Sequence, residues 1–159
     1  MYVVDASVFI QAANSYYAFD LVPRFWSWLE SRVATDLFTV IPVRDEILAQ
    51  NDQLSEWLVS VDDPSWVFAV DGDGTQLQMP TIAKHCVDHG YKPAGISKFL
   101  SGADPWVIAC AMENNWVVVT HEIAQPETRK RVKMPDVCNE LGVPNILVFD
   151  MLRQLGFSA

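Results

Sequence analysis

The chain has 159 residues, half of them hydrophobic, and a formal net charge of −9. This length suits one domain with a sizeable core, so we expect residues 1–159 to fold as a single domain. The acidic balance argues against a protein that coats nucleic acid through a basic face, but not against an enzyme that binds a polyanion through divalent metal ions.

No apolar run approaches the roughly 18 residues that a membrane-spanning helix needs. The N-terminal segment "MYVVDASVFI" has no basic stretch before its apolar residues, as a signal peptide would. We therefore expect a cytoplasmic protein with no membrane partner. The cysteines Cys86, Cys110 and Cys138 are odd in number and far apart, which predicts reduced core residues rather than disulfides or a zinc site.

Short runs of β-branched and aromatic residues predict the strands. They are apolar throughout instead of alternating with polar residues, which is typical of parallel strands buried on both faces. In chain order these runs are "YVV" (2–4), "LFTVI" (37–41), "WVVVT" (116–120) and "NILVF" (145–149).

Helical patterns separate these strands. Strands that alternate with helices predict an α/β fold, with a central parallel sheet of about five strands and helices on both faces. Residues 52–102 are the least regular part of the sequence. The predicted helices span 21–34, 43–50, 75–90, with Pro80 breaking or delaying it, 104–115 and 135–142.

Four acidic residues follow the predicted strands, at the edge of the sheet where α/β proteins bind ligands. Each has a simple structural explanation: a helix cap for Asp5 and Asp104, a solvated helix face for Glu46, and a loop charge for Glu122. Together, however, four neighbouring carboxylates repel one another unless a cation holds them ionised. Because the ligands would all be oxygens, the pattern predicts a site for Mg²⁺ or Mn²⁺.

The segment "SGADPWVIACA" (101–111) carries the most ambiguous of these acids. Asp104 followed by Pro105 is a good start for a helix, because an aspartate can cap the free N–H groups and a proline at the first helical position loses no hydrogen bond. Capping alone explains the pair, so only its partners can show whether Asp104 also serves a site.

The segments "VVDAS", "ADPWVIACA" and "VVVTHE", with Glu46 between the first two, resemble in order and spacing the acidic motifs of PIN domains, also called PilT N-terminus-like nucleases. The resemblance covers nearly the whole chain, and the part from "VKMPDVCNELG" onward is similar to a mostly uncharacterised bacterial and archaeal subgroup. It implies a metal-dependent endoribonuclease that leaves 3′-hydroxyl and 5′-phosphate ends. Its partners would be an RNA substrate and, for a toxin of a toxin–antitoxin pair, a small antitoxin protein.

By position, the resemblance makes Asp5, Glu46, Asp104 and Glu122 both catalytic residues and metal ligands. Ser7 and Thr120 would support the site. Many PIN domains have aspartate where this chain has Glu122, whose longer side chain could bind metal through water. The sequence leaves open whether the chain forms a homodimer.

A basic run, "RKRVK" (129–133), follows Glu122 by a few residues. A solvated loop explains such a run, but beside an acidic metal site it could hold the phosphates that flank the scissile one. The candidate RNA-binding residues are Arg129, Lys130, Arg131 and Lys133.

Two other functions stay open. The stretch "VFAVDGDGTQL" (67–77) resembles the first motif of haloacid-dehalogenase-like phosphatases, with Asp71 as nucleophile and Asp73 as acid/base, although the later motifs of that family are missing. A turn after a short strand explains the same residues. The chain could also be a catalytically inactive PIN-fold binding module.

Overall fold

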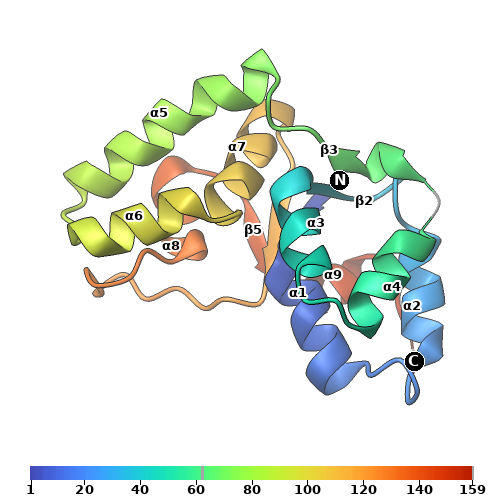
Figure 1. The fold of residues 1–159 in the computed structure, drawn as a ribbon. Coiled ribbons are helices and arrows are strands. Elements are labelled where there is room, and N and C mark those ends of the chain that lie inside the picture. The colour runs from blue at the N-terminus through green and yellow to red at the C-terminus, as the bar shows by residue number, and fades with distance from the viewer. Residues whose placement is uncertain (62, 159) are drawn as a thin grey trace.

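Five parallel strands form the centre of the α/β fold (Figure 1). In this computed structural model, which describes residues 1–61 and 63–158, the strand order is β3-β2-β1-β4-β5, and every neighbouring pair is parallel. The predicted fold class is confirmed. The strands are β1 (Tyr2–Val4), β2 (Leu37–Val40), β3 (Val67–Phe68), β4 (Val117–Thr120) and β5 (Asn145–Leu147).

The middle of the sheet is buried on both faces. Val3 pairs with Phe38 on one side and with Val118 on the other, and Val3 and Val118 are both inaccessible to solvent. Because both faces are buried, polar residues at alternate positions would have no contact with solvent. The strands therefore have continuous apolar runs in the sequence.

Helices cover both faces of the sheet. Figure 1 shows α1 to α4 on one side and α5 to α8 on the other, and α7 packs against β1, β2 and β4. The first group is α1 (Ala6–Gln11), continued by the π-helical turn η1 (Ala12–Tyr16), α2 (Pro23–Glu30), α3 (Ile41–Leu48) and α4 (Gln53–Ser60). The remaining elements are the 3₁₀ turn η2 (Pro64–Trp66), α5 (Asp73–Asp88), α6 (Pro93–Ser101), α7 (Asp104–Asn114), α8 (Met134–Leu141) and α9 (Val148–Gln154).

The prediction that residues 52–102 are the least regular part is wrong. This stretch holds α4, β3, α5 and α6. The sequence patterns that would predict these elements are weak. The strand β3 has only two residues, and α4 begins with a capping box between Asp52 and Ser55 instead of the common form with glutamate.

Pro80 does not break α5, contrary to the prediction. The helix runs without interruption from Asp73 to Asp88, and Pro80 lies on its exposed side. The carbonyl of Gln76, which Pro80 cannot satisfy, can therefore bond to water, and this reduces the cost of the proline. The last strand is also shorter than predicted, because Val148 already begins α9.

A segment without helix or strand, residues 121–133, connects β4 to α8; we call it the strap. Figure 1 shows it passing beneath α6 and α8. Backbone N–H groups hold it at two points: Gln125 donates to both carboxylate oxygens of the buried Asp136, at 3.0 and 2.9 Å, and Lys92 donates to the Arg129 carbonyl at 2.8 Å. Among the described helices, none is long and apolar enough to span a membrane.

Candidate functional site

The four predicted acids line one pocket at the carboxyl end of the sheet. Asp5, Glu46, Asp104 and Glu122 border a cavity of about 320 Å³, together with Ser7, Arg131 and three other residues. Asp5 follows β1, Glu46 is in the helix that follows β2, Asp104 begins α7, and Glu122 follows β4. Parallel strands bring these distant segments to the same edge.

Asp5 is the most fixed of the four side chains. Its backbone N–H donates to the Val119 carbonyl at 3.0 Å, and its carbonyl accepts from the Val8 N–H at 3.2 Å, so β4 and α1 both hold it. It occupies the N-cap position of α1, but its side chain makes no capping bond. Instead, Asp5 Oδ2 accepts from the Ser7 hydroxyl at 2.5 Å and from the Thr120 hydroxyl at 3.2 Å.

Ser7 and Thr120, which the PIN-domain resemblance predicts to support the site, both lie beside Asp5. Each hydroxyl also accepts a backbone hydrogen bond: Ser7 from His121 N–H and Thr120 from Glu122 N–H, both at 3.1 Å. Because these N–H groups orient the hydroxyls, the hydroxyl protons point toward Asp5 and fix its carboxylate.

The environment of Asp5 disfavours its negative charge. Asp5 is only 4% exposed. Burial raises its pKa most, the hydroxyls of Ser7 and Thr120 lower it, and Glu122 raises it further.

Glu46 stands at the rim of the pocket on α3, and as a residue it is exposed. Partial loss of hydration and the nearby charge of Asp5 raise its pKa. Its flexible side chain can reach over the pocket or turn away from it.

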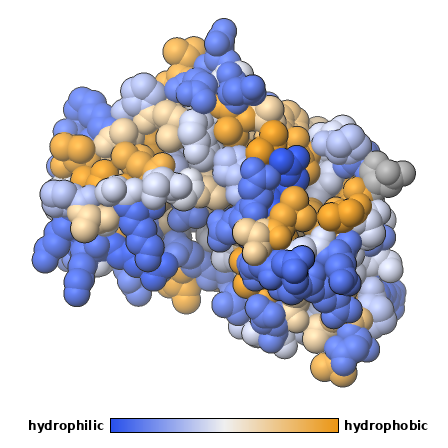
Figure 2. Space-filling model, viewed as in Figure 1, coloured by the Kyte–Doolittle hydropathy of each residue, from blue (hydrophilic) through white to orange (hydrophobic). Residues whose placement is uncertain are grey.

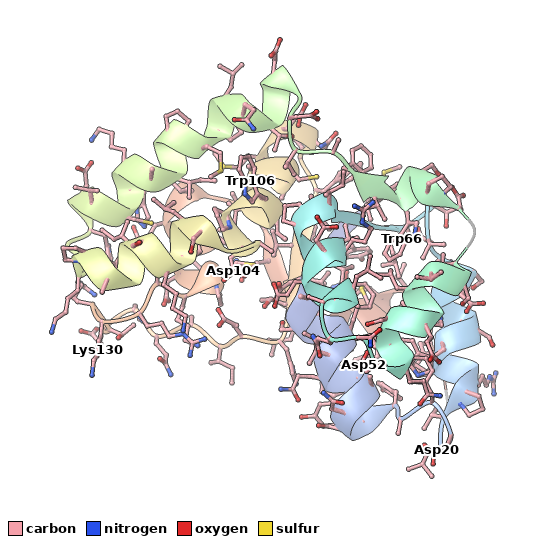
Figure 3. The ribbon with its side chains drawn as sticks, viewed as in Figure 1. Asp20, Asp52, Trp66, Asp104, Trp106 and Lys130 are labelled. Atoms are coloured by element: carbon pink, nitrogen blue, oxygen red, sulfur yellow. The ribbon has the colours of Figure 1, made fainter. Side chains whose placement is uncertain are left out.

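Asp104 is not the cap of α7, and the capping interpretation is wrong. Ala103 holds the N-cap position, and its carbonyl accepts from the N–H groups of Trp106 and Val107 at 3.0 and 3.2 Å. Asp104 is the first helical residue, so its side chain is not needed for the capping bonds and borders the acidic pocket (Figure 3).

The pKa of Asp104 is raised to about 7. Burial is the largest cause, followed by the charges of Asp5, Glu122 and Glu46, while Arg131 opposes the shift. A carboxylate with this pKa gains strongly from a cation placed near it.

Glu122 differs from the other three because its oxygens have positive partners. Oε1 accepts from Lys133 Nζ at 3.2 Å and from Arg131 Nη2 at 3.5 Å, and Oε2 accepts from the Met134 N–H at 3.2 Å. Met134 is the first residue of α8, so Glu122 also meets the positive end of that helix. In this arrangement Glu122 ties the strap to α8, and its role as a metal ligand stays a prediction.

The donors suit a hard divalent cation, although they are not fully assembled. Within residues 1–61 and 63–158, no three His, Cys, Asp or Glu side chains form a ready-made metal site. Asp5, Glu46 and Asp104 nonetheless share one pocket, offer only oxygens, and all have raised pKa values. Rotation of the exposed Glu46 toward Asp5 and Asp104 would complete a set of ligands that Mg²⁺ or Mn²⁺ favours.

The basic run divides into residues with different surroundings. Arg131 and Lys133 contact Glu122, whereas the Arg129 guanidinium donates to the carbonyls of Pro126 and Thr128. Lys130 lines a second pocket beside the acidic one, and Lys98 of α6 lines it too. No motif in the sequence marks Lys98, because only the packing of α6 against the strap brings it to this side of the site.

The alternative phosphatase residues lie elsewhere. Asp71 and Asp73 are exposed, follow the two-residue edge strand β3, and are not among the residues that line the acidic pocket. Asp73 is the first residue of α5, which is a common place for an acidic residue. Thr75 is buried and donates to Glu113 of α7, so this part of the motif joins two helices.

A comparison with protein-family models gives a match over residues 2–159 to the family described as "Domain of unknown function (DUF4411)". No curated protein matches the chain.

Proposed function

The chain belongs to the DUF4411 family, whose description states no activity, and from the acidic pocket together with the PIN-domain resemblance we propose that it is a metal-dependent endoribonuclease. One observation carries this proposal: Asp5, Glu46 and Asp104, from three separate segments, border one pocket at the carboxyl edge of a parallel sheet, and all three have raised pKa values. Selection for stability alone gives no reason to gather charges that repel.

We assign the cation to Asp5, Glu46 and Asp104, with Glu122 as the fourth acid. When bound, Mg²⁺ or Mn²⁺ would lower the pKa of an attacking water and would stabilise negative charge on the phosphoryl and leaving oxygens. The chain's part is to orient Asp5 through Ser7 and Thr120 and to place Arg131 beside the acids, where it can bind a phosphate oxygen.

The proposal includes the biological setting implied by the PIN-domain resemblance. RNA is the substrate, a small antitoxin protein is the partner, and the protein acts in the cytoplasm. Coexpression supports this setting if the chain stops growth alone and the product of a neighbouring small gene restores it. Growth arrest that persists in the Asp104→Asn variant would contradict it.

The direct test is cleavage of a labelled single-stranded RNA by the purified chain. We expect cleavage with Mn²⁺ or Mg²⁺, none in EDTA, and products with 3′-hydroxyl and 5′-phosphate ends. Asp104→Asn should lower the rate by about two orders of magnitude or more, because it removes a charged ligand of the cation. Asp71→Asn, an exposed aspartate outside the pocket, is the matched control and should cleave normally.

Three outcomes contradict the proposal. Undiminished cleavage in EDTA excludes the metal mechanism. Metal binding without cleavage of any RNA pool favours the inactive binding module. Hydrolysis of small phosphate esters that disappears in Asp71→Asn favours the phosphatase.

A further inference from the structure

A second pocket, of about 520 Å³, continues from the acidic one. Glu46, Asp104 and Arg131 border both pockets, so the two form one connected depression. Ala94, Gly95, Lys98 and Phe99 of α6 form one wall, and Lys130, Arg131 and Val132 of the strap form the other. Figure 3 shows Asp104 at the inner end of α6 and Lys130 farther out on the strap.

The two walls are fixed against each other. A Cβ at Gly95 would lie only 2.6 Å from the Lys130 carbonyl oxygen, so the strap backbone approaches α6 as closely as a glycine allows. The bond from Lys92 N–H to the Arg129 carbonyl holds the same contact, and Val132 is buried. The pocket is therefore part of the folded structure rather than a gap under a loose loop.

Positive charge gathers around this pocket in an otherwise acidic protein. Six of the chain's eleven lysines and arginines lie in α6, just before it, or in the strap: Lys92, Lys98, Arg129, Lys130, Arg131 and Lys133. Figure 2 shows hydrophilic side chains along the strap and the adjacent edge of α6. Lys98 and Lys130 line the pocket on opposite walls, while the other lining residues are largely apolar: Ala94, Phe99, Ala103 and Val132.

We propose that this pocket binds one nucleotide of an unpaired RNA strand, next to the phosphate that the acidic pocket holds. Lys98 and Lys130 bind the phosphate oxygens, and the apolar lining receives the base. The inference rests on the proposed nuclease function, because a strand that enters the acidic pocket continues into this depression. It adds a binding residue, Lys98, and a nucleotide site between α6 and the strap.

The shape of the pocket favours a single strand over a duplex. In a duplex the bases face inward and are paired, so none can enter a recess between α6 and the strap without unpairing. Proteins that bind single strands combine a positive groove with surfaces for exposed bases, and both are found here. The chain's net charge of −9 would also oppose the approach of the second strand of a duplex.

The experiment measures binding separately from cleavage. All variants carry Asp104→Asn, and binding of a labelled eight-nucleotide RNA is followed by fluorescence anisotropy in Mg²⁺, with gels to check that the RNA is intact. We expect Lys98→Ala and Lys130→Ala each to raise Kd by about five- to tenfold and to lower the slope of log K against log salt by about 0.7. Lys98→Arg should retain most of the affinity because it keeps the charge.

Lys84→Ala is the matched control. Lys84 is an exposed lysine on α5 that pairs with Asp88, away from both pockets, and its removal should leave Kd within twofold. A duplex of the same sequence should bind at least about tenfold more weakly than the single strand.

The outcomes separate this proposal from the proposed function. Cut RNA on the control gels would mean that Asp104 is dispensable for cleavage and would contradict the assignment of the cation to Asp104, while the lysine effects could still be read from the intact fraction. Equal affinity for the duplex, or an unchanged Kd in Lys98→Ala, would overturn the subsite. An oligo-glutamate peptide that competes as well as RNA would show a site for acidic proteins and would also overturn it.

Discussion

Asp104 shows how the position of one residue changes its interpretation. Its sequence context, Asp-Pro before an apolar run, suits a helix cap, but Ala103 occupies that position and Asp104 lies in the acidic pocket. The carboxyl therefore gives α7 no capping bond, and its ionisation is opposed by burial and by three other acids. Its presence in the fold costs stability unless a cation is bound.

This cost gives a pH-dependent prediction for the protein in EDTA. The pKa of Asp104 is about 7 in the folded chain and near 3.8 when the chain is unfolded, so folding favours the protonated form. The contribution of the protonated Asp104 carboxyl to the free energy of unfolding is complete below about pH 4 and is lost as the pH rises through 7. Asp104→Asn cannot ionise, so we expect it to melt several degrees above the parent at pH 8 and close to it at pH 4.

Thermal melts in EDTA at several pH values check this prediction. The exposed control Asp71→Asn should follow the parent at every pH, because surface substitutions of this kind change stability little. If Asp104→Asn is less stable than the parent at pH 8, the carboxylate has a favourable partner, and the repulsion argument for the site fails.

Glu122 provides the contrasting residue. Its carboxylate already has partners: Lys133 and Arg131 pair with its negative charge, and the Met134 N–H donates a hydrogen bond to it. Glu122→Gln keeps the shape and some of these hydrogen bonds, so we expect it to retain more nuclease activity than Asp104→Asn. Equal losses in the two variants, measured as cleavage rate at saturating Mn²⁺, would instead place Glu122 among the essential ligands.

The contact between α6 and the strap decides whether the basic wall of the pocket is in place. Gly95→Ala would place a methyl group 2.6 Å from the Lys130 carbonyl oxygen, a clash with backbone that only a shift of the strap or α6 can relieve. We expect a loss of about 1–3 kcal/mol in the free energy of unfolding and weaker RNA binding.

Gly102→Ala is the control for this change. Gly102 borders the same pocket, but a Cβ there would meet Phe99 and Lys98 carbonyl oxygens at 3.6 and 3.7 Å, which is ordinary contact. Urea unfolding and RNA binding should therefore change far less than in Gly95→Ala. If the two alanine variants behave alike, the close approach of the strap does not control the pocket.

The three cysteines report on the integrity of the core, because they lie in three different helices. Cys86, Cys110 and Cys138 are buried in α5, α7 and α8, and burial raises their pKa values to about 11, 11 and 12. Since the thiolate is the reactive form, the folded protein should react with a thiol reagent only through opening of the structure.

We therefore expect no rapid thiol reaction in native buffer and three reactive thiols per chain in urea. The rate in native buffer should follow stability across the variants, so Gly95→Ala should react faster than Gly102→Ala. A cysteine that reacts at once in the folded protein would show that one of these three helices is not packed as described.

The sequence alone determined the strands of the sheet centre and the acids that follow them. Continuous apolar runs arise because these strands are buried on both faces, and in a parallel sheet an acid after a strand lies at one common edge. The parallel α/β sheet, the start of α7 at Asp104 and the gathering of four acids could therefore be predicted without any tertiary contact.

The tertiary structure alone decided the surroundings of those acids. No local pattern shows that Ala103 is the cap, that Glu122 binds Lys133 and α8, or that Lys98 and Lys130 line the same pocket. The irregular appearance of 52–102 has the same origin, because two-residue β3 and proline-containing α5 form through packing on their neighbours. The periodicity of apolar residues in the sequence indicates which face of a helix or strand is buried. Contacts between distant segments depend instead on how those faces pack together.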